Sequence, residues 1–269
     1  MRLTATDLRF GYDPARPVLD GVSFTCESPG VLCVLGTNGT GKSTLLRNLI
    51  GELRPLAGTV ELDGRPVGSY RPAELARRFA YLPQTHAPSF SYNVIDVVTM
   101  GRTSRIGYLA SPGVSDVEFA REQLVYLGIE HLADRPYTEV SGGERQLVMI
   151  AAALAQEPEA LLLDEPTAHL DFGNQYRFVG LVERLRERGI GVLMTTHFPD
   201  HALMLDCPTA VLSKGRIQRL GPAREVVCDE VMTQVYGIPV TVAHVGDRTT
   251  CIPGPIRYDA GREEGVSHA

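Results

Sequence analysis

Short strand-like segments alternate with amphipathic stretches along most of the chain. The strand-like segments stand at residues 31–36, 79–84, 159–165 and 190–197. Short apolar runs without a polar face are typical of strands that are buried on both sides. Strands that alternate with helices indicate a mainly parallel sheet with helical crossovers. The pattern therefore predicts an α/β fold.

Turn residues predict antiparallel strand pairs beside this core. The first 30 residues have the pattern of two short strands, residues 3–12 and 18–27, which are broken by Asp-Pro and Asp-Gly pairs. Hairpin turns are expected at Asp63–Gly64, Lys214–Gly215 and Gly246–Asp247. The chain should therefore combine a parallel core with antiparallel pairs.

Helical patterns dominate the middle of the chain, from about residue 85 to residue 156. This block is a candidate helical subdomain, and a capping box of Ser115 and Glu118 is expected to open one of its helices. A second amphipathic helix is expected to end at Gly189. The last dozen residues are expected to be a frayed tail.

Composition narrows the class of protein. The 269 residues carry a formal net charge of −6, which disfavours a broad nucleic-acid surface. Five cysteines without a CxxC pair favour reduced thiols over a disulfide framework. No run of about 18 apolar residues is present, so no spanning helix is predicted. The first ten residues lack the apolar centre of a signal peptide.

The segment GTNGTGKST fits the GxxxxGK[ST] pattern of a phosphate-binding loop, and it lies between a predicted strand and a predicted helix. Glycines let the backbone wrap a polyphosphate, while the loop amides and the helix dipole attract its oxygens. Lys42 is expected to reach the β- and γ-phosphates, and Ser43 to bind Mg²⁺. The predicted nucleotide-binding residues are Gly36, Thr37, Asn38, Gly39, Thr40, Gly41, Lys42, Ser43 and Thr44.

Two carboxylates, Asp164 and Glu165, follow a buried strand in the segment LLLDEP. Ligands of open α/β sheets bind at this end of the strands. Asp164 is expected to hold Mg²⁺ through water, and Glu165 to orient or deprotonate an attacking water. Gln84 ends another strand, and its amide is expected to bind Mg²⁺ or that same water.

His197 ends the strand VLMTTH and is expected to hydrogen-bond the γ-phosphate or the attacking water. A zinc site shared with His201 is the alternative, but Pro199 argues against a regular helix between them and no third ligand is evident. Tyr12 is expected to stack on adenine, because the phosphate loop contacts no base.

The segment SGGERQ, residues 141–146, combines a helix cap with two adjacent glycines. Ser141 and Glu144 predict a capping box. The cap does not explain Gly142 and Gly143, each of which costs about 1 kcal/mol relative to alanine inside a helix. We therefore expect a ligand to approach the bare amides there.

These motifs in this order resemble the nucleotide-binding subunit of ABC transporters. They are Tyr12, the phosphate loop, Gln84, SGGERQ, LLLDEP, AHLD (168–171) and TTH (195–197). The resemblance implies a P-loop NTPase core with a mixed β-sheet, an N-terminal antiparallel β-subdomain and an inserted helical subdomain. It implies an ATPase domain over residues 1–240, with a C-terminal extension and polar tail over residues 241–269. It also implies ATP and Mg²⁺ as cofactors and ATP hydrolysis as the activity.

The resemblance also implies partners. In such proteins two copies pack head to tail, so Ser141, Gly142 and Gly143 of one copy would close over the γ-phosphate held by the other, with Asp171 at the dimer seam. The dimer would sit beneath integral membrane permease subunits, on the cytoplasmic face of the inner membrane, and would be served indirectly by an extracytoplasmic substrate-binding protein. No nucleic-acid partner is expected. Residues 91–105 are expected to contact the permease, with Arg102 and Arg105 as test positions.

Within this family the chain looks most like the ATPases of importers for iron-siderophores, haem and cobalamin, and importers of molybdate or tungstate remain possible. The supporting segments are VIDVVTMGR, GIEHLADRPYTEVSGGERQ and HLDFGNQ. Departures from the family pattern are Val140, Leu147, His169 and the pair Thr103–Ser104. The rival interpretations are a soluble ABC ATPase such as an iron–sulfur assembly factor, a non-catalytic nucleotide-binding regulator and the ATPase of a split exporter.

Overall fold

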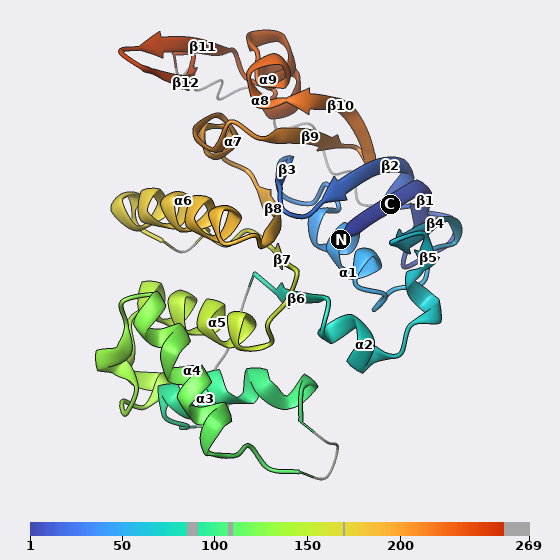
Figure 1. Ribbon diagram of the computed structural model, residues 1–269. Helices are drawn as coiled ribbons and strands as arrows, with labels where there is room; N and C mark the ends of the chain where they lie inside the picture. Colours follow the sequence, from blue (N-terminus) through green and yellow to red (C-terminus); the bar gives the residue numbers. More distant parts are fainter. Residues whose placement is uncertain (85–90, 107–109, 169, 256–269) are drawn as a thin grey trace, which may run out of the picture.

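A six-stranded sheet forms the centre of the computed structural model, in the order β10-β9-β3-β8-β7-β6 (Figure 1). The strands are β3 (Val31–Leu35), β6 (Phe79–Leu82), β7 (Ala160–Leu163), β8 (Gly191–Thr196), β9 (Pro208–Ser213) and β10 (Arg216–Pro222). All neighbours pair in parallel except β9 and β10, which form the predicted hairpin. The structure describes residues 1–84, 91–106, 110–168 and 170–255. The mainly parallel sheet predicted from the sequence is confirmed.

A second sheet is antiparallel and forms the expected N-terminal β-subdomain, in the order β2-β1-β4-β5. Its strands are β1 (Arg2–Phe10), β2 (Leu19–Glu27), β4 (Ala57–Leu62) and β5 (Arg65–Pro66). The turn between β4 and β5 has positive φ at Asp63 and Gly64, as a tight hairpin requires. The buried face of this sheet shares one hydrophobic core with α1 (Lys42–Leu49), the helix that follows the phosphate loop.

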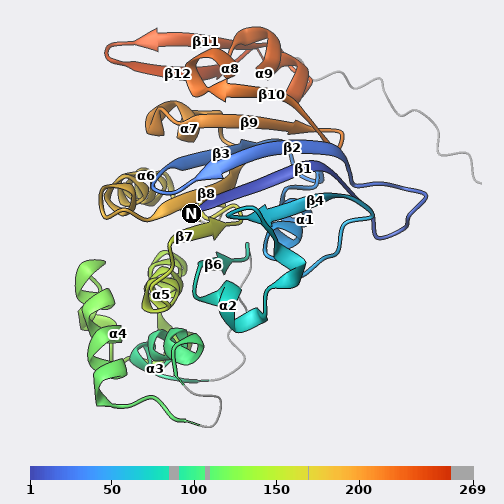
Figure 2. The ribbon, with the colours of Figure 1, turned by 45° about the vertical axis from the view of Figure 1, so that its right-hand side comes forward.

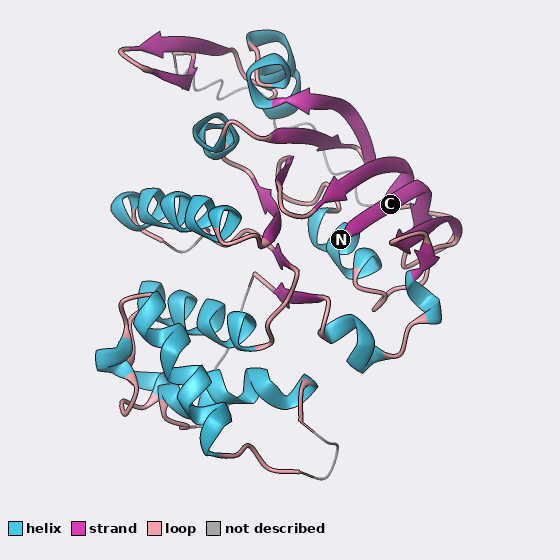
Figure 3. Cartoon of the chain, in the orientation of Figure 1, coloured by secondary structure: helices cyan, strands magenta, loops and turns pink. Residues whose placement is uncertain are grey.

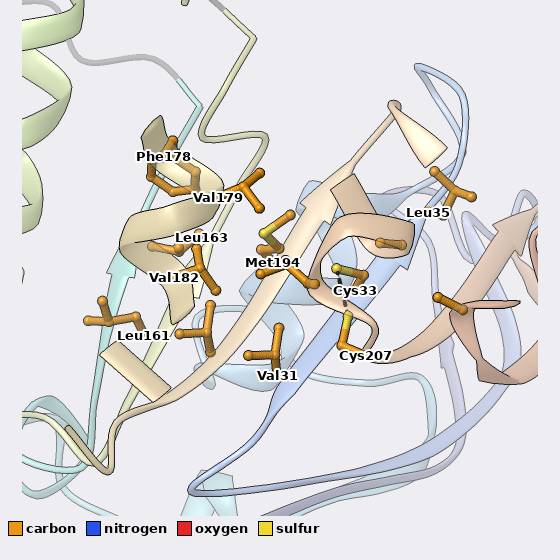
Figure 4. Close-up of a cluster of buried hydrophobic side chains, with 14 of the residues drawn as sticks. Val31, Cys33, Leu35, Leu161, Leu163, Phe178, Val179, Val182, Met194 and Cys207 are labelled. Atoms are coloured by element: carbon orange, nitrogen blue, oxygen red, sulfur yellow. Dashed lines mark hydrogen bonds between the residues drawn. The ribbon is translucent and has the colours of Figure 1, made fainter. Parts of the chain in front are cut away.

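The largest hydrophobic core lies between the central sheet and the helices α6 (Phe172–Glu187) and α7 (Pro199–Leu205). Figure 4 shows part of this cluster, in which Cys33 and Cys207 face each other with their sulfurs 3.3 Å apart. All five cysteines are free thiols, as predicted. Gly189 has a positive φ just after α6, so the predicted end of that helix is confirmed.

The helical subdomain has its own hydrophobic core, and Ile150, Ala153 and Leu154 connect it to the core of the central sheet. Figures 1 and 3 show it at the lower end of the molecule, next to β6. Its main helices are α3 (Val94–Met100), α4 (Val114–Tyr126) and α5 (Gly142–Ala155). The capping box predicted at Ser115 and Glu118 is wrong, because α4 begins at Val114. The Gly113 amide donates to the Asp116 carboxylate at 3.0 Å, and Arg102 contacts the same carboxylate at 3.1 Å, which fixes the earlier start.

The chain after β10 forms two short helices and a hairpin at the edge of the molecule (Figure 2). They are α8 (Ala223–Val226), α9 (Asp229–Tyr236), β11 (Val240–Val245) and β12 (Arg248–Pro253). The hairpin turn at Gly246 is confirmed. The remaining helices are α2 (Pro72–Ala76) and short 3-10 turns at Val67–Ser69, Gly101–Ser104, Glu130–Leu132 and Tyr137–Glu139. The predicted tail and His169 lie outside the described residues.

Candidate functional site

The phosphate loop connects β3 to α1, as its motif requires. Gly39 and Gly41 have φ of 78° and 99°, which side chains rarely tolerate. A Cβ at Gly36 would lie 2.4 Å from the carbonyl oxygen of Leu212. The loop is therefore built so that only glycine fits at these turns. Its amides precede the N-terminus of α1, where backbone donors and the helix dipole favour an anion.

Lys42 is buried and makes three contacts through its ammonium group. Nζ donates to the carbonyl oxygens of Gly36 and Thr37, at 2.8 Å each, and lies 2.9 Å from Oε1 of Glu165. The Lys42 and Glu165 side chains are 4% and 8% exposed, so solvent screens this ion pair little. The lysine therefore connects the phosphate loop directly to the carboxylate predicted to be catalytic.

Glu165 is the point where the predicted catalytic residues meet. Gln84 donates from Nε2 to Oε2 at 3.3 Å, and Nδ1 of His197 lies 3.0 Å from the same oxygen. Burial raises the pKa of Glu165, but the hydrogen bond and charge of Lys42 and the contact with His197 outweigh it, so the pKa lies below its ordinary value. The carboxylate is thus ionised at neutral pH and can only accept, which places the hydrogen of His197 on Nδ1.

Asp164 is 2% exposed and is oriented by two hydroxyl groups. Thr195 donates to Oδ1 at 2.8 Å, and Tyr81 donates to Oδ2 at 3.4 Å. The Thr195 oxygen also accepts from the backbone amide of Glu165 at 2.8 Å, so one hydroxyl holds both acidic residues. Neither Thr195 nor Tyr81 was predicted from the sequence. Thr195 stands in the TTH segment that carries the family resemblance, but that segment gave no signal that its hydroxyl holds Asp164 and Glu165.

A cleft of about 350 Å³ opens over this cluster. It is lined by Val18, Asn38, Gly39, Gly41, Lys42, Ser43, Thr44, Gln84 and Glu165. Among the described residues, no group of three or more His, Cys, Asp or Glu side chains could hold a metal ion. A hydroxyl at Ser43, an amide oxygen at Gln84 and the carboxylate of Asp164 are the sparse oxygen ligands that suit Mg²⁺ shared with phosphates.

Tyr12 lies beside this cleft, 64% exposed, with its ring edge against Phe10. Its hydroxyl lies 3.5 Å from Oγ1 of Thr44 and accepts from Arg47 at 3.1 Å. An exposed ring next to the start of α1 is compatible with stacking on a base, and that role of Tyr12 stays a prediction.

The two histidines considered for zinc face different partners. Nδ1 of His201 lies 3.0 Å from the hydroxyl of Thr196, whereas Nδ1 of His197 faces Glu165. His201 is 5% exposed, and burial lowers its pKa from 6.5 to about 4. His201 is therefore a histidine packed in the protein interior. The geometry gives no support to a zinc site shared between His201 and His197.

Ser141 and Glu144 form the predicted capping box at the start of α5. The Ser141 amide donates to Glu144 at 2.8 Å, and the Glu144 amide donates to the Ser141 hydroxyl at 3.3 Å. Gly142 and Gly143 occupy the first turn of the helix. A Cβ at Gly142 would meet nothing within 4 Å, and one at Gly143 would meet Nδ2 of Asn174 at 3.3 Å. Packing against the part of the chain that the structure describes therefore does not require glycine at position 142.

Ser141 and Gly143 line a separate small cleft, not the one at the phosphate loop. Asp171 lies outside the phosphate-loop cleft too, where it caps α6 by accepting from the amide of Asn174 at 2.8 Å and from its side chain at 2.9 Å. Within one copy, the structure thus brings together Lys42, Gln84, Glu165 and His197 and leaves the SGG segment and Asp171 elsewhere.

Known proteins are similar to most of this chain. The family model described as ABC transporter matches residues 19–168, more than half of the chain. The chain is 40% identical to the hemin import ATP-binding protein HmuV of Nocardia farcinica, over 87% of this chain and 81% of that protein. It is 34% identical to the molybdate import ATP-binding protein MolC of Haemophilus influenzae, over 88% and 89% of the two chains.

A solved ABC transporter assigned to the metal-chelate type, in an inward-facing conformation, superposes with a TM-score of 0.83. The identity is 34%, and the match covers 94% of this chain and 97% of the other. In the part of the chain that the structure describes, none of the helices has the length and apolar character needed to traverse a bilayer. The fold, the phosphate-loop geometry and these matches together show that the chain belongs to the ABC transporter ATP-binding family and is an ATP hydrolase.

Proposed function

We propose that this chain is the ATP-hydrolysing subunit of an importer for a metal chelate of the iron-siderophore, haem or cobalamin type, or for molybdate or tungstate. The names of its relatives support import, and they divide between hemin and molybdate. The similar solved structure supports the metal-chelate side of that choice. The proposal therefore concerns a class of importer, and a peripheral location at the cytoplasmic face of the inner membrane follows from it.

The convergence of Lys42, Gln84 and His197 on Glu165 carries the catalytic part of the proposal. Glu165 would orient the attacking water and accept its proton, because its carboxylate is ionised and faces the cleft. Lys42 and the loop amides would stabilise the charge that develops on the γ-phosphate. His197, held through Nδ1, keeps Nε2 available for the γ-phosphate or the water. Mg²⁺, held by Ser43, Asp164 and Gln84, would neutralise phosphate charge when bound.

A second copy would complete the site. No contact among the described residues requires glycine at position 142, and we infer that its bare amide faces a ligand that approaches from outside. Ser141, Gly142 and Gly143 lie at the N-terminus of α5, where a phosphate is favoured. We therefore propose the head-to-tail dimer, with Asp171 near the seam.

A groove of about 660 Å³ separate from the nucleotide cleft supports a permease partner. Its apolar lining includes Leu53, Val67, Tyr70, Leu75 and Phe79, and it extends to Gln156. Arg105 donates to the backbone of Gln156 at 2.9 Å, so the proposed contact segment, residues 91–105, adjoins this groove.

The arginines of that segment are unsuitable test positions, because both of them support the end of α5. Arg102 lies between Asp116 and Glu157 and donates to the carbonyl of Ala155, and Arg105 donates to the carbonyl of Glu157. Met100 is 48% exposed and is the better choice. Met100→Glu should reduce transport while the ATPase activity of the isolated chain stays within about twofold. Undiminished transport would place the permease contact elsewhere.

The overall proposal is tested by purifying the Glu165→Gln protein from detergent-solubilised native membranes in the presence of ATP. Loss of the base should trap the ATP-bound dimer, and a membrane permease should be recovered with it. Lys42→Ala, which weakens phosphate binding, is the matched control and should recover less permease. Recovery of soluble partners alone by an intact ATP dimer would overturn the import proposal and favour an iron–sulfur assembly factor. A monomer with unchanged turnover would contradict the role of Glu165.

A further inference from the structure

The C-terminal part of the chain holds the segment that carries His197 at two points. The hydroxyl of Tyr236, in α9, donates to the backbone carbonyl of His197 at 2.7 Å. Three residues after His197, the Asp200 carboxylate accepts from the Thr250 hydroxyl at 2.6 Å and from the Cys251 amide at 2.9 Å. Both anchors come from residues 229–253, and both end on the short link between β8 and the first turn of α7.

This C-terminal part is itself fixed to the body of the protein. The Val242 amide donates to Asp229 at 2.8 Å, which ties the hairpin to α9. Val242 and Cys251 pack against the largest hydrophobic core. The Arg248 guanidinium lies 5.5 Å from the ring centre of Tyr176 on α6. The anchors on His197 and Asp200 therefore come from a supported element and not from a loose tail.

The peptide group that links His197 to Phe198 is held at both of its polar atoms. Its N–H donates to the hydroxyl of the neighbouring Thr196 at 3.0 Å, whereas its carbonyl, which belongs to His197, accepts from the C-terminal part of the chain. His197 follows the last residue of β8 and lies two residues before the first residue of α7. Among the bonds of the described residues, its carbonyl accepts only from Tyr236. Its ring must stay 3.0 Å from a Glu165 carboxylate that is 8% exposed. A rotation of this peptide group would move the imidazole ring of His197 away from Glu165.

We propose that residues 229–253 form a positioning element for catalysis, in which the Tyr236 hydroxyl fixes the backbone of His197 and thereby the ring on Glu165. This inference rests on the catalytic role proposed for His197. It assigns a task to α9 and to the β11–β12 hairpin, which lie outside the segment matched by the family model. Because no residue of 229–253 lines the nucleotide cleft, we expect the effect on turnover and not on ATP binding.

The first experiment compares Tyr236→Phe with Thr209→Val in the full-length chain. Thr209 is the control, since its buried hydroxyl also donates to a backbone carbonyl, that of Cys207 at 3.1 Å, and it lines neither the nucleotide cleft nor the groove proposed for the permease. Tyr236→Phe should lower kcat about tenfold, the effect of one neutral hydrogen bond, and leave KM for ATP within about twofold. Thr209→Val should leave both constants unchanged. Equal kinetics of the two variants would overturn the proposal.

The second experiment combines Tyr236→Phe with His197→Ala. If Tyr236 acts through His197, the substitution should lower kcat in the wild-type background but have no further effect once the imidazole is gone. Independent losses that multiply would show a merely structural role and overturn the proposal. If His197→Ala alone leaves kcat unchanged, the catalytic role of His197 fails, which is a different result.

A third measurement needs no turnover. Amide hydrogen exchange over residues 196–203 should accelerate in Tyr236→Phe and in Thr250→Val, which removes the side-chain bond of the second anchor, but not in Thr209→Val. Unchanged exchange in both anchor variants would contradict the proposed support.

Discussion

A single atom, the hydroxyl oxygen of Thr195, fixes the positions of both acidic residues, Asp164 and Glu165. It donates to Asp164 and accepts from the amide of Glu165, and Thr195 is 0% exposed. Glu165 has φ of 45°, a conformation that non-glycine residues adopt at a cost and that the surroundings must hold. We predict that Thr195→Val, which replaces only the hydroxyl, damages both stability and catalysis.

The loss of stability can be estimated because the groups that bond to the Thr195 hydroxyl are buried. The substitution leaves the Glu165 amide and one oxygen of Asp164 without this partner, where water cannot replace it. Each unpaired buried group costs about 1–3 kcal/mol, and the added methyl returns about 0.8 kcal/mol. The free energy of unfolding should therefore fall by about 1–5 kcal/mol. With an unfolding entropy of about 2.1 cal/mol/K per residue, Tm should fall by about 2–9 °C for a chain of 269 residues.

The assay compares thermal unfolding with ATP turnover at several Mg²⁺ concentrations. Thr195→Val should lower kcat about tenfold or more and raise the Mg²⁺ requirement, because Asp164 and Glu165 are no longer fixed. Thr209→Val is the control: Thr209 is also 0% exposed, and its hydroxyl donates to the carbonyl of Cys207 at 3.1 Å. That variant should lose stability and keep kcat. Wild-type Tm and kcat in Thr195→Val would refute the reasoning.

Three further predictions concern single residues. The pKa of His201 is lowered from 6.5 to about 4, so its contribution to stability is complete above pH 6.5 and is lost as the pH falls towards 4. Chemical denaturation at pH 7 and pH 5 should show a smaller pH-dependent loss for His201→Gln, and an equal loss would contradict the assignment. Tyr12→Ala should weaken ATP binding about tenfold by calorimetry whereas Tyr12→Phe should not, since stacking of a base on a ring contributes about 1–3 kcal/mol; equal affinities would place adenine elsewhere. Gly142→Ala should keep or slightly raise Tm, because its Cβ meets nothing within 4 Å, yet abolish ATP-dependent dimerisation of the Glu165→Gln protein in sedimentation. A normal ATP dimer would show that the amide of residue 142 faces no phosphate.

The sequence predicted the strands, the hairpins and the phosphate loop because local chemistry determines them. Buried parallel strands require unbroken apolar runs, and the turns at Asp63–Gly64 and Lys214–Gly215 require residues that tolerate positive φ. The start of α4 was predicted wrongly because a contact that is distant in the sequence determines it. Ser115 and Glu118 satisfy the local capping pattern, but the ion pair of Asp116 with Arg102, which is distant in sequence, selects a different cap.

The same distinction explains which site residues could be predicted. Lys42, Asp164 and Glu165 stand in motifs whose spacing is local, whereas Thr195 and Tyr236 act through partners 31 and 39 residues away in the sequence. The TTH segment contains Thr195 but predicts a role for His197 alone, and a tyrosine in a short helix carries no pattern that distinguishes it from an ordinary packing residue. Yet the hydroxyl of Thr195 accepts from the amide of Glu165, whose backbone is left-handed, and the hydroxyl of Tyr236 donates to the carbonyl of His197. Motifs therefore predict the groups that are expected to contact ATP, whereas the residues that hold those groups in place are identified only from the folded structure, in which their hydroxyls reach the site.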